Sequence, residues 1–160
     1  MEKTELYETF QKGLTSVNGE SYIAKKADVA ATLTKIFQDK DTHEVALVET
    51  PLLKEIGAVD ALKAAGIKVD TDHFRKNAPD DKGGVTEADY GIANLGSIVQ
   101  MKDDIDCRIV ETVSDVYVGI VKLSKIVDTF DDMIDIMAET KPFPKFAGII
   151  TGPSRTADIE

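Results

Sequence analysis

Short apolar runs alternate with segments of helical periodicity along most of this chain, and this alternation restricts its possible folds more than any other feature. A compact run such as 45–48 (Val-Ala-Leu-Val), with polar residues on both sides, is typical of a strand buried on both faces. Strand–helix–strand alternation favours parallel pairing with right-handed crossovers. The sequence therefore predicts an α/β fold, a three-layer α/β/α domain with a mainly parallel sheet. Strands are expected at 45–48, 67–69, 97–101, 116–121 and 146–150.

Apolar residues three and four positions apart predict the helices. Leu6, Phe10 and Leu14 form one stripe over 4–14, which Gly13 and an Asn18-Gly19 turn are expected to close. Residues 70–84 contain a proline, four aspartates and two glycines, and they predict a long surface loop. Further helices are expected over 29–37, between Pro51 and Gly66, over 86–93, near 106–113, and from Asp128 or Thr129 to Pro142.

Composition limits the partners and the compartment. The 19 basic and 29 acidic residues leave a formal charge of −10, so binding to nucleic acid or to an acidic membrane surface is disfavoured. No apolar run reaches the ~18–20 residues that cross a bilayer, and the charged first residues lack the apolar core of a secretory signal. The single cysteine, Cys107, excludes an intrachain disulfide and an all-cysteine metal or iron–sulfur site in this chain. We expect one cytoplasmic domain over 1–160.

The residues after the last predicted strand have the chemistry of an anion site. Gly152 lets backbone approach a ligand closely, Ser154 and Thr156 supply hydroxyls, and Arg155 supplies a planar fork for a carboxylate or phosphate. In a parallel sheet, ligands gather at the carboxyl ends of strands. The alternative is structural: Ser154 caps a helix and Arg155 forms an ion pair. Only three arginines, Arg75, Arg108 and Arg155, can supply such a fork.

A second block, 83–97, holds four glycines in fifteen residues. Its spacing does not match a nucleotide-binding fingerprint, because Gly91 and Gly96 precede a strand instead of following one. Thr86 with Asp89 three residues later is typical of a capped short helix, and a ligand-binding turn is the other interpretation.

These two blocks resemble the signature segments of the LUD (lactate utilisation) domain family, specifically its LutC/YkgG branch. The first is 84–93 (Gly-Val-Thr-Glu-Ala-Asp-Tyr-Gly-Ile-Ala) with Gly96-Ser97 beyond it, and the second is 152–160 (Gly-Pro-Ser-Arg-Thr-Ala-Asp-Ile-Glu). The resemblance implies a fold similar to the NagB/RpiA/CoA-transferase-like fold. It also implies a role in oxidising L-lactate to pyruvate beside iron–sulfur partner proteins, which would hold the clusters while this chain binds no cofactor.

The resemblance also implies a ligand site for a small carboxylate or phosphorylated compound, but it assigns no catalytic residue. That site is expected to comprise Gly84, Thr86, Asp89, Gly96, Ser97, Gly152, Ser154, Arg155 and Thr156. Two alternatives stay open: an independent enzyme of the formyltetrahydrofolate cyclo-ligase or CoA-transferase kind, and a non-catalytic scaffold for an iron–sulfur subunit.

The chain departs from the family at three places. Asn94-Leu95 precedes Gly96-Ser97, where the family usually has an acidic or small polar pair. Ser114 and Tyr117 stand where the family commonly has proline and histidine, and a tyrosine cannot transfer protons near neutral pH unless its pKa is strongly lowered. The family also continues past the second block through a helix to a final strand, whereas this chain stops at Glu160. We therefore expect either that the chain is a truncated or partly disordered form, or that it has lost the last strand and pairs the exposed sheet edge with a partner chain or a second copy.

The remaining candidates favour structural roles. His43 and His73 lie thirty residues apart with no helical pairing, so no metal site is expected. The aspartates near 103–106 and 128–135 lack the pattern of a calcium loop and are expected on solvated faces or at helix starts. Cys107 is expected to be a small buried residue.

Overall fold

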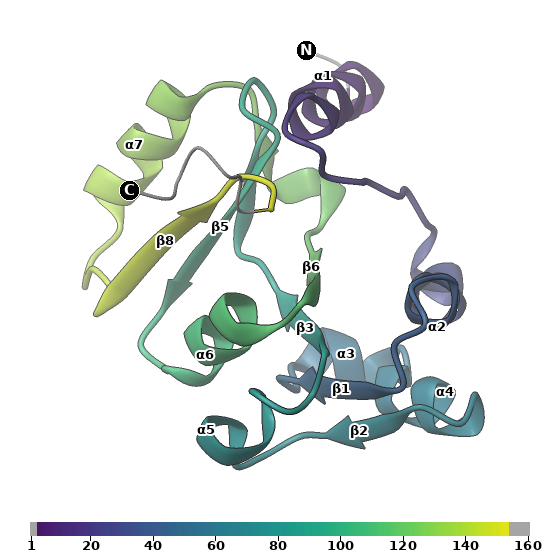
Figure 1. Cartoon of the computed structure of the whole chain (residues 1–160). Coiled ribbons are helices and arrows are strands. Elements are labelled where there is room, and N and C mark those ends of the chain that lie inside the picture. Colours follow the sequence, from purple (N-terminus) through teal and green to yellow (C-terminus); the bar gives the residue numbers. More distant parts are fainter. Residues whose placement is uncertain (1–2, 154–160) are drawn as a thin grey trace, which may run out of the picture. The chain divides into compact units, whose positions relative to one another are not determined.

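The structure, a computed structural model, describes residues 3–153. These residues form two compact units, each with its own four-stranded sheet (Figure 1). Unit 1 takes residues 3–22, 88–103 and 121–153, and unit 2 takes 23–87 and 104–120. The two units are described in turn.

Unit 2 contains a fully parallel sheet in the order β2-β1-β3-β6. Val45 pairs with Val69 on one side and with Gly83 on the other, which places β1 at the centre. Three of its strands were predicted to within one or two residues, and β3 was not. The strands are β1 (Glu44–Leu47), β2 (Lys68–Asp70), β3 (Gly83–Glu87) and β6 (Val116–Ile120).

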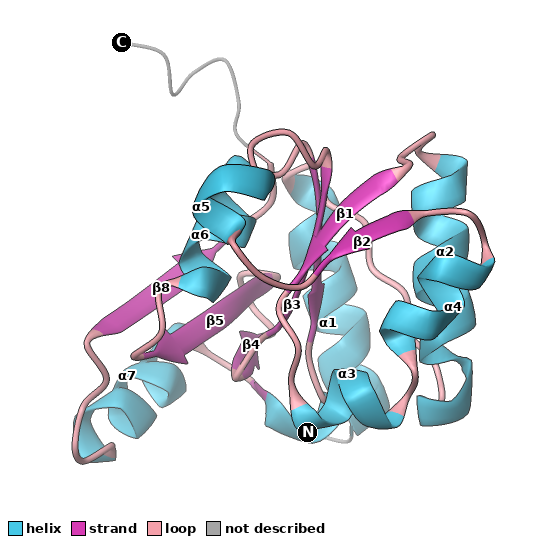
Figure 2. Cartoon of the chain, turned by 90° about the horizontal axis from the view of Figure 1, so that it is seen from below, coloured by secondary structure: helices cyan, strands magenta, loops and turns pink. Residues whose placement is uncertain are grey.

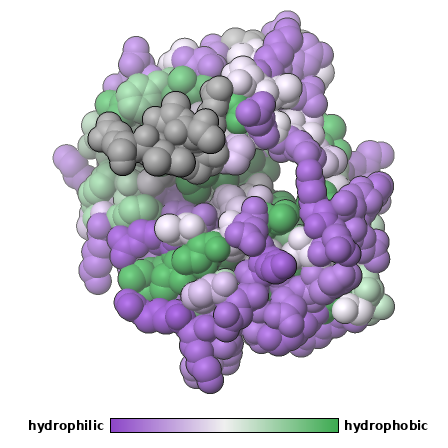
Figure 3. All heavy atoms as spheres, viewed as in Figure 1, coloured by the Kyte–Doolittle hydropathy of each residue, from purple (hydrophilic) through white to green (hydrophobic). Residues whose placement is uncertain are grey.

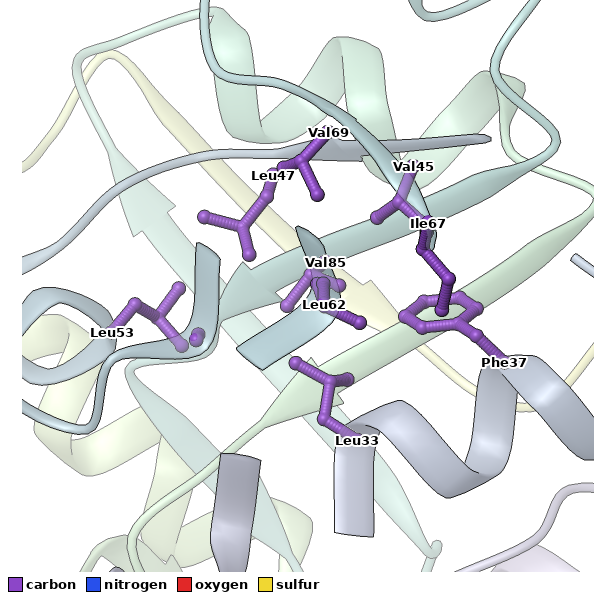
Figure 4. Packing of buried hydrophobic residues seen from close by; sticks show 10 residues of the cluster. Leu33, Phe37, Val45, Leu47, Leu53, Leu62, Ile67, Val69 and Val85 are labelled. Atoms are coloured by element: carbon purple, nitrogen blue, oxygen red, sulfur yellow. The ribbon is translucent and has the colours of Figure 1, made fainter. Parts of the chain in front are cut away.

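Helices cover both faces of this parallel sheet (Figure 2). The larger core, drawn in Figure 4, lies between the sheet and α2–α4 and includes Leu33, Phe37 and Leu62. On the opposite face, Ala46 packs with Phe74 and Val110, which come from the two helices on that side. The first group consists of a short 3₁₀ turn η1 (Lys26–Asp28), α2 (Val29–Asp39), α3 (Pro51–Glu55) and α4 (Ala58–Ala64), and the second of α5 (Phe74–Asn77) and α6 (Asp106–Val113).

Unit 1 contains a mixed sheet in the order β7-β4-β5-β8. The β4–β5 and β5–β8 pairs are antiparallel, and β4–β7 is parallel. Ile98 faces α1 whereas the neighbouring Val99 faces α7, so this sheet too is covered on both sides. The elements are α1 (Lys3–Ser16), β4 (Tyr90–Ile92), β5 (Ser97–Lys102), the 3₁₀ turn η2 (Leu123–Lys125), β7 (Ile126–Val127), α7 (Phe130–Glu139) and β8 (Phe146–Ile150).

Local chemistry explains where several helices begin. Thr50 accepts a hydrogen bond from the Leu53 N–H and Pro51 occupies the first turn of α3, as predicted. At α7, Thr129 and Asp132 form a capping box, and the hydrogen bonds from Thr129 lower the pKa of the Asp132 carboxyl. The predicted start at 128 or 129 is therefore confirmed.

The helix predicted over 86–93 is wrong. Residues 83–87 and 90–92 are the strands β3 and β4. The Thr86–Asp89 spacing imitates a capping box, but the Thr86 hydroxyl pairs with Tyr117 and the Asp89 carboxylate accepts the Met101 N–H. Tertiary partners thus replace the local pairing on which the helix prediction rested.

Three further predictions need correction. The segment 70–84 is no simple surface loop, because it contains α5 with Phe74 and Ala78 buried beneath it, and ends in β3. Gly13 does not close α1, which continues to Ser16. The last strand, β8, was placed in a parallel sheet but runs antiparallel to β5. Within residues 3–153, no helix is long and apolar enough to cross a membrane.

Candidate functional site

The carboxyl ends of β1 and β3 hold a candidate group within unit 2. From β1 the chain continues to β2 on one side, whereas β3 and then β6 lie on the other side. In open parallel sheets, ligands bind outside the point where the strand order reverses in this way. The residues to consider are therefore those that end β1 and β3.

Two short hydroxyl contacts occupy this end of the sheet. The Thr86 and Tyr117 hydroxyls lie 2.7 Å apart, with Thr86 fully buried. One residue further, the Thr50 hydroxyl donates to Glu87 Oε2 at 2.5 Å. Side chains alternate between the two faces of a strand, so the Thr86–Tyr117 and Thr50–Glu87 contacts lie on opposite faces of the sheet. The hydroxyl groups can both donate and accept hydrogen bonds, which suits a small polar ligand.

Gly84 lies on the same face of β3 as Thr86, and it pairs with Tyr117 in the β3–β6 register. A Cβ atom at Gly84 would lie 2.1 Å from Ser114 Oγ and 2.8 Å from Val110 Cγ1. The glycine therefore allows α6 to approach the sheet. Its contact with a ligand stays a prediction.

Glu111, on α6, is a titratable group that the sequence did not single out. It is partly buried, and its Oε2 accepts no hydrogen bond from any group in the described part of the chain. Burial raises its pKa to about 7, and Arg108 opposes that change. A carboxyl with such a pKa can exchange a proton near neutral pH.

A separate candidate group lies within unit 1, where β5 and β8 bring the two signature blocks together. Ile98 pairs with Ile150, and the Ser97 and Thr151 hydroxyls lie 2.6 Å apart beyond that pair. Ser97 is fully buried. This hydroxyl contact holds the chain at the point where the second block begins.

Gly96 and Gly152, which flank that contact, both have left-handed backbones, with φ of 63° and 65°. A Cβ at Gly152 would lie 2.6 Å from Val17 Cγ2, and one at Gly96 would lie 2.0 Å from the Leu14 backbone nitrogen. Both glycines are therefore required by the turn and by α1.

Asp89 lies apart from this group. Its carboxylate accepts the Met101 N–H at 2.7 Å and binds the Lys102 ammonium at 2.7 Å. Met101 is four residues along β5 from Ser97, a span of roughly 13 Å. In unit 1 the structure thus brings Gly96, Ser97 and Gly152 together but not Asp89. Ser154, Arg155 and Thr156 lie outside the described residues.

Sequence reasoning missed Thr50, Glu87 and Thr151 as members of these two groups. Thr50 had a usable signal, since a threonine between a buried strand and Pro51 is typical of a helix cap at a strand end. Glu87 and Thr151 had none, because their partners are 37 and 54 residues away. Cys107 is buried, as predicted. No group of three or more metal-ligating residues occurs among those the structure describes.

A double-mutant cycle would measure the Thr86–Tyr117 contact. Thr86→Val keeps the shape but leaves the Tyr117 hydroxyl without this partner, so the free energy of unfolding should fall by about 1–3 kcal/mol. Tyr117→Phe should cost a similar amount. The double variant should cost clearly less than the sum, measured by urea unfolding. Additive losses would show that the two hydroxyls do not depend on each other.

A family model described as the LUD domain matches residues 7–160. This chain belongs to the LUD domain family. The domain is also similar to "Lactate utilization protein C" of Macrococcus caseolyticus (strain JCSC5402), with 36% identity over 81 residues, 48% of this chain and 35% of that protein. The match thus spans about a third of that relative's length. Both findings confirm the family and the LutC branch that the two blocks indicated.

Among solved structures, this LUD domain is similar to a DUF162 family protein from Deinococcus radiodurans. The TM-score is 0.70 at 12% identity, and the match covers 94% of this chain and 89% of that one. At that identity the likeness concerns the fold alone. With helices on both faces of each sheet, the predicted three-layer α/β/α class is confirmed.

Proposed function

We propose that this LUD domain is a component of a cytoplasmic lactate-utilisation system that oxidises L-lactate to pyruvate. The observation that carries the proposal is the 36% identity to Lactate utilization protein C across 81 residues. The oxidation removes two electrons and two protons from the substrate. With one cysteine, this chain cannot supply the ligands of an iron–sulfur cluster, so the electrons would pass to clusters on partner proteins.

Within that system, this chain would bind a small anionic ligand, a carboxylate or a phosphorylated compound. Arg155 would hold the anion through a bidentate contact, with Ser154 and Thr156 adding hydroxyl donors. The Ser97–Thr151 contact supports this arrangement, because it anchors the chain three residues before Ser154. In unit 2, Glu111 would be a proton-exchanging group.

Growth and copurification test this proposal together. A strain of the source organism that lacks this protein should fail to grow on L-lactate but grow on pyruvate. The wild-type gene should restore growth, Arg155→Ala should not, and Lys63→Ala on α4 should serve as the control for loss of one positive charge. Tagged protein should copurify with iron–sulfur subunits. Undiminished growth of the deletion strain would contradict the proposal, and a thermal shift with acyl-CoA or nucleotide would favour an independent enzyme.

A further inference from the structure

Three basic residues surround a hollow between α5 and α6 of unit 2. The hollow measures about 290 Å³ and its lining consists of His73, Phe74, Arg75, Lys76 and Asp106. The two helices pack against each other and lie side by side in Figure 2. Phe74 is 4% exposed and anchors α5 to the core, so the turn that carries Arg75 and Lys76 is held in place.

The charge of this hollow is unlike that of the chain as a whole. The protein has a formal charge of −10, yet two permanent cations and a histidine face one carboxylate here. Arg75 and Lys76 are exposed, and the side chain of neither has a hydrogen bond or an ion pair within 4 Å among residues 3–153. His73 is close to Asp72, with 2.9 Å between Nδ1 and Oδ1. Hydrophilic residues cover much of the surface drawn in Figure 3.

Arg75 is the arginine best placed to receive an anion in the described part of the chain. Arg108 already takes part in another interaction. Arg75, by contrast, lines the hollow, where its charged neighbour is Asp106. A planar fork beside a compact ammonium matches the oxygens of a tetrahedral dianion, which the fork binds in two places and the ammonium in a third.

We propose that the α5–α6 hollow binds the phosphate group of a small phosphorylated compound. The Arg75 fork and the Lys76 ammonium can together bind three oxygens of a phosphate, whereas a carboxylate offers only two. The hollow shares no residue with the site around Ser97 and Arg155. The proposal is therefore independent of the proposed role in lactate oxidation.

A substitution at Asp106 is expected to change phosphate binding in the opposite direction to a substitution at Arg75 or Lys76. Its carboxylate lies on the hollow, and burial and Asp104 raise its pKa while Arg75 opposes the change. An ionised Asp106 repels a bound dianion. Asp106→Asn should therefore strengthen binding, whereas the loss of Arg75 or Lys76 should weaken it.

Isothermal titration of the full chain with inorganic phosphate, at pH 7.5 and constant ionic strength, tests the proposal. Wild type should bind one phosphate saturably. Arg75→Ala should weaken binding by at least about tenfold, and Arg75→Lys should restore part of it. Lys76→Ala should weaken it severalfold, and Asp106→Asn should strengthen it severalfold. Lys63→Ala and Asp60→Asn, which make the same charge changes on α4, should bind as wild type does.

Three outcomes would overturn the proposal. The first is no saturable phosphate binding by the wild-type chain. The second is equal weakening by Lys63→Ala and Arg75→Ala, which would reflect net charge alone. The third is L-lactate displacing phosphate at equal concentration, which would assign the hollow to carboxylates. Circular dichroism of each variant should match wild type, because Arg75 and Lys76 are exposed.

Discussion

Replacing Gly96 with alanine is expected to lower the free energy of unfolding by about 3 kcal/mol or more. Two effects add at this position. The backbone has a φ of 63°, which costs a residue with a Cβ about 1–2 kcal/mol. The new Cβ would also lie 2.0 Å from the Leu14 nitrogen and 2.5 Å from the Gly13 carbonyl carbon, and both are backbone atoms that no rotamer change can move.

A matched control separates the two effects. Gly66 also has a left-handed backbone, with φ of 81°, but a Cβ there meets nothing within 4 Å. Gly66→Ala should therefore cost only the conformational part, about 1–2 kcal/mol. Urea unfolding of both variants gives the comparison. Equal losses would show that α1 can move away from the β4–β5 turn at little cost.

The same contact explains why the sequence misplaced the end of α1. A glycine at the end of an apolar stripe usually marks the end of a helix. Gly13 instead lies within α1, where a Cβ would be 2.6 Å from the Gly96 nitrogen. The two glycines lie 83 residues apart in the chain. Nothing local distinguishes a glycine that ends a helix from one that lets another backbone approach.

Where local pattern and tertiary environment agreed, the fold was predictable from the sequence. The run 45–48 became the central strand β1, and the stripe through Leu33 and Phe37 became the buried face of α2. Where they disagreed, prediction failed. Thr86 has the local chemistry of a helix cap, yet its hydroxyl finds a partner 31 residues away at Tyr117.

The sequence predicted individual candidate residues, but it did not predict which of them lie close together. The glycine and hydroxyl content of two blocks pointed to Gly96, Ser97 and Gly152, and the β5–β8 pairing does bring these together. The same blocks also contain Asp89, but its carboxylate contacts Met101, which lies four residues along β5 from Ser97. Residue types show which side chains can bind a ligand, whereas register decides which of them meet.

At pH 7.5 the Asp81→Asn variant is expected to be more stable than the wild-type protein, because it lacks one buried charge. Asp81 is 1% exposed, and neither of its carboxylate oxygens accepts a hydrogen bond from another residue in the range 3–153. Lys68 Nζ lies 3.7 Å from Asp81 Oδ1 but only 3.0 Å from Asp70 Oδ2. The lysine is thus shared between two carboxylates.

Burial first, and the neighbouring Asp70 second, raise the pKa of Asp81 from 3.8 to about 6, while Lys68 opposes them. Folding therefore favours the protonated carboxyl. The stabilisation is complete below pH 3.8 and is lost as pH rises through 6. Over that interval, the free energy of unfolding should lose at most about 3 kcal/mol from this group.

Asparagine at position 81 retains a donor toward Asp70 and carries no charge, so it imitates the protonated form. Its free energy of unfolding should exceed that of wild type by about 1–3 kcal/mol at pH 7.5 and should equal it near pH 4. The exposed neighbour Asp80 offers the matched control, since Asp80→Asn removes the same charge without a buried site. Because other carboxylates titrate in the same range, the difference between variant and wild type is the quantity to follow across pH. An advantage of Asp81→Asn that stays constant from pH 4 to 7.5 would show that packing, and not ionisation of Asp81, sets the difference.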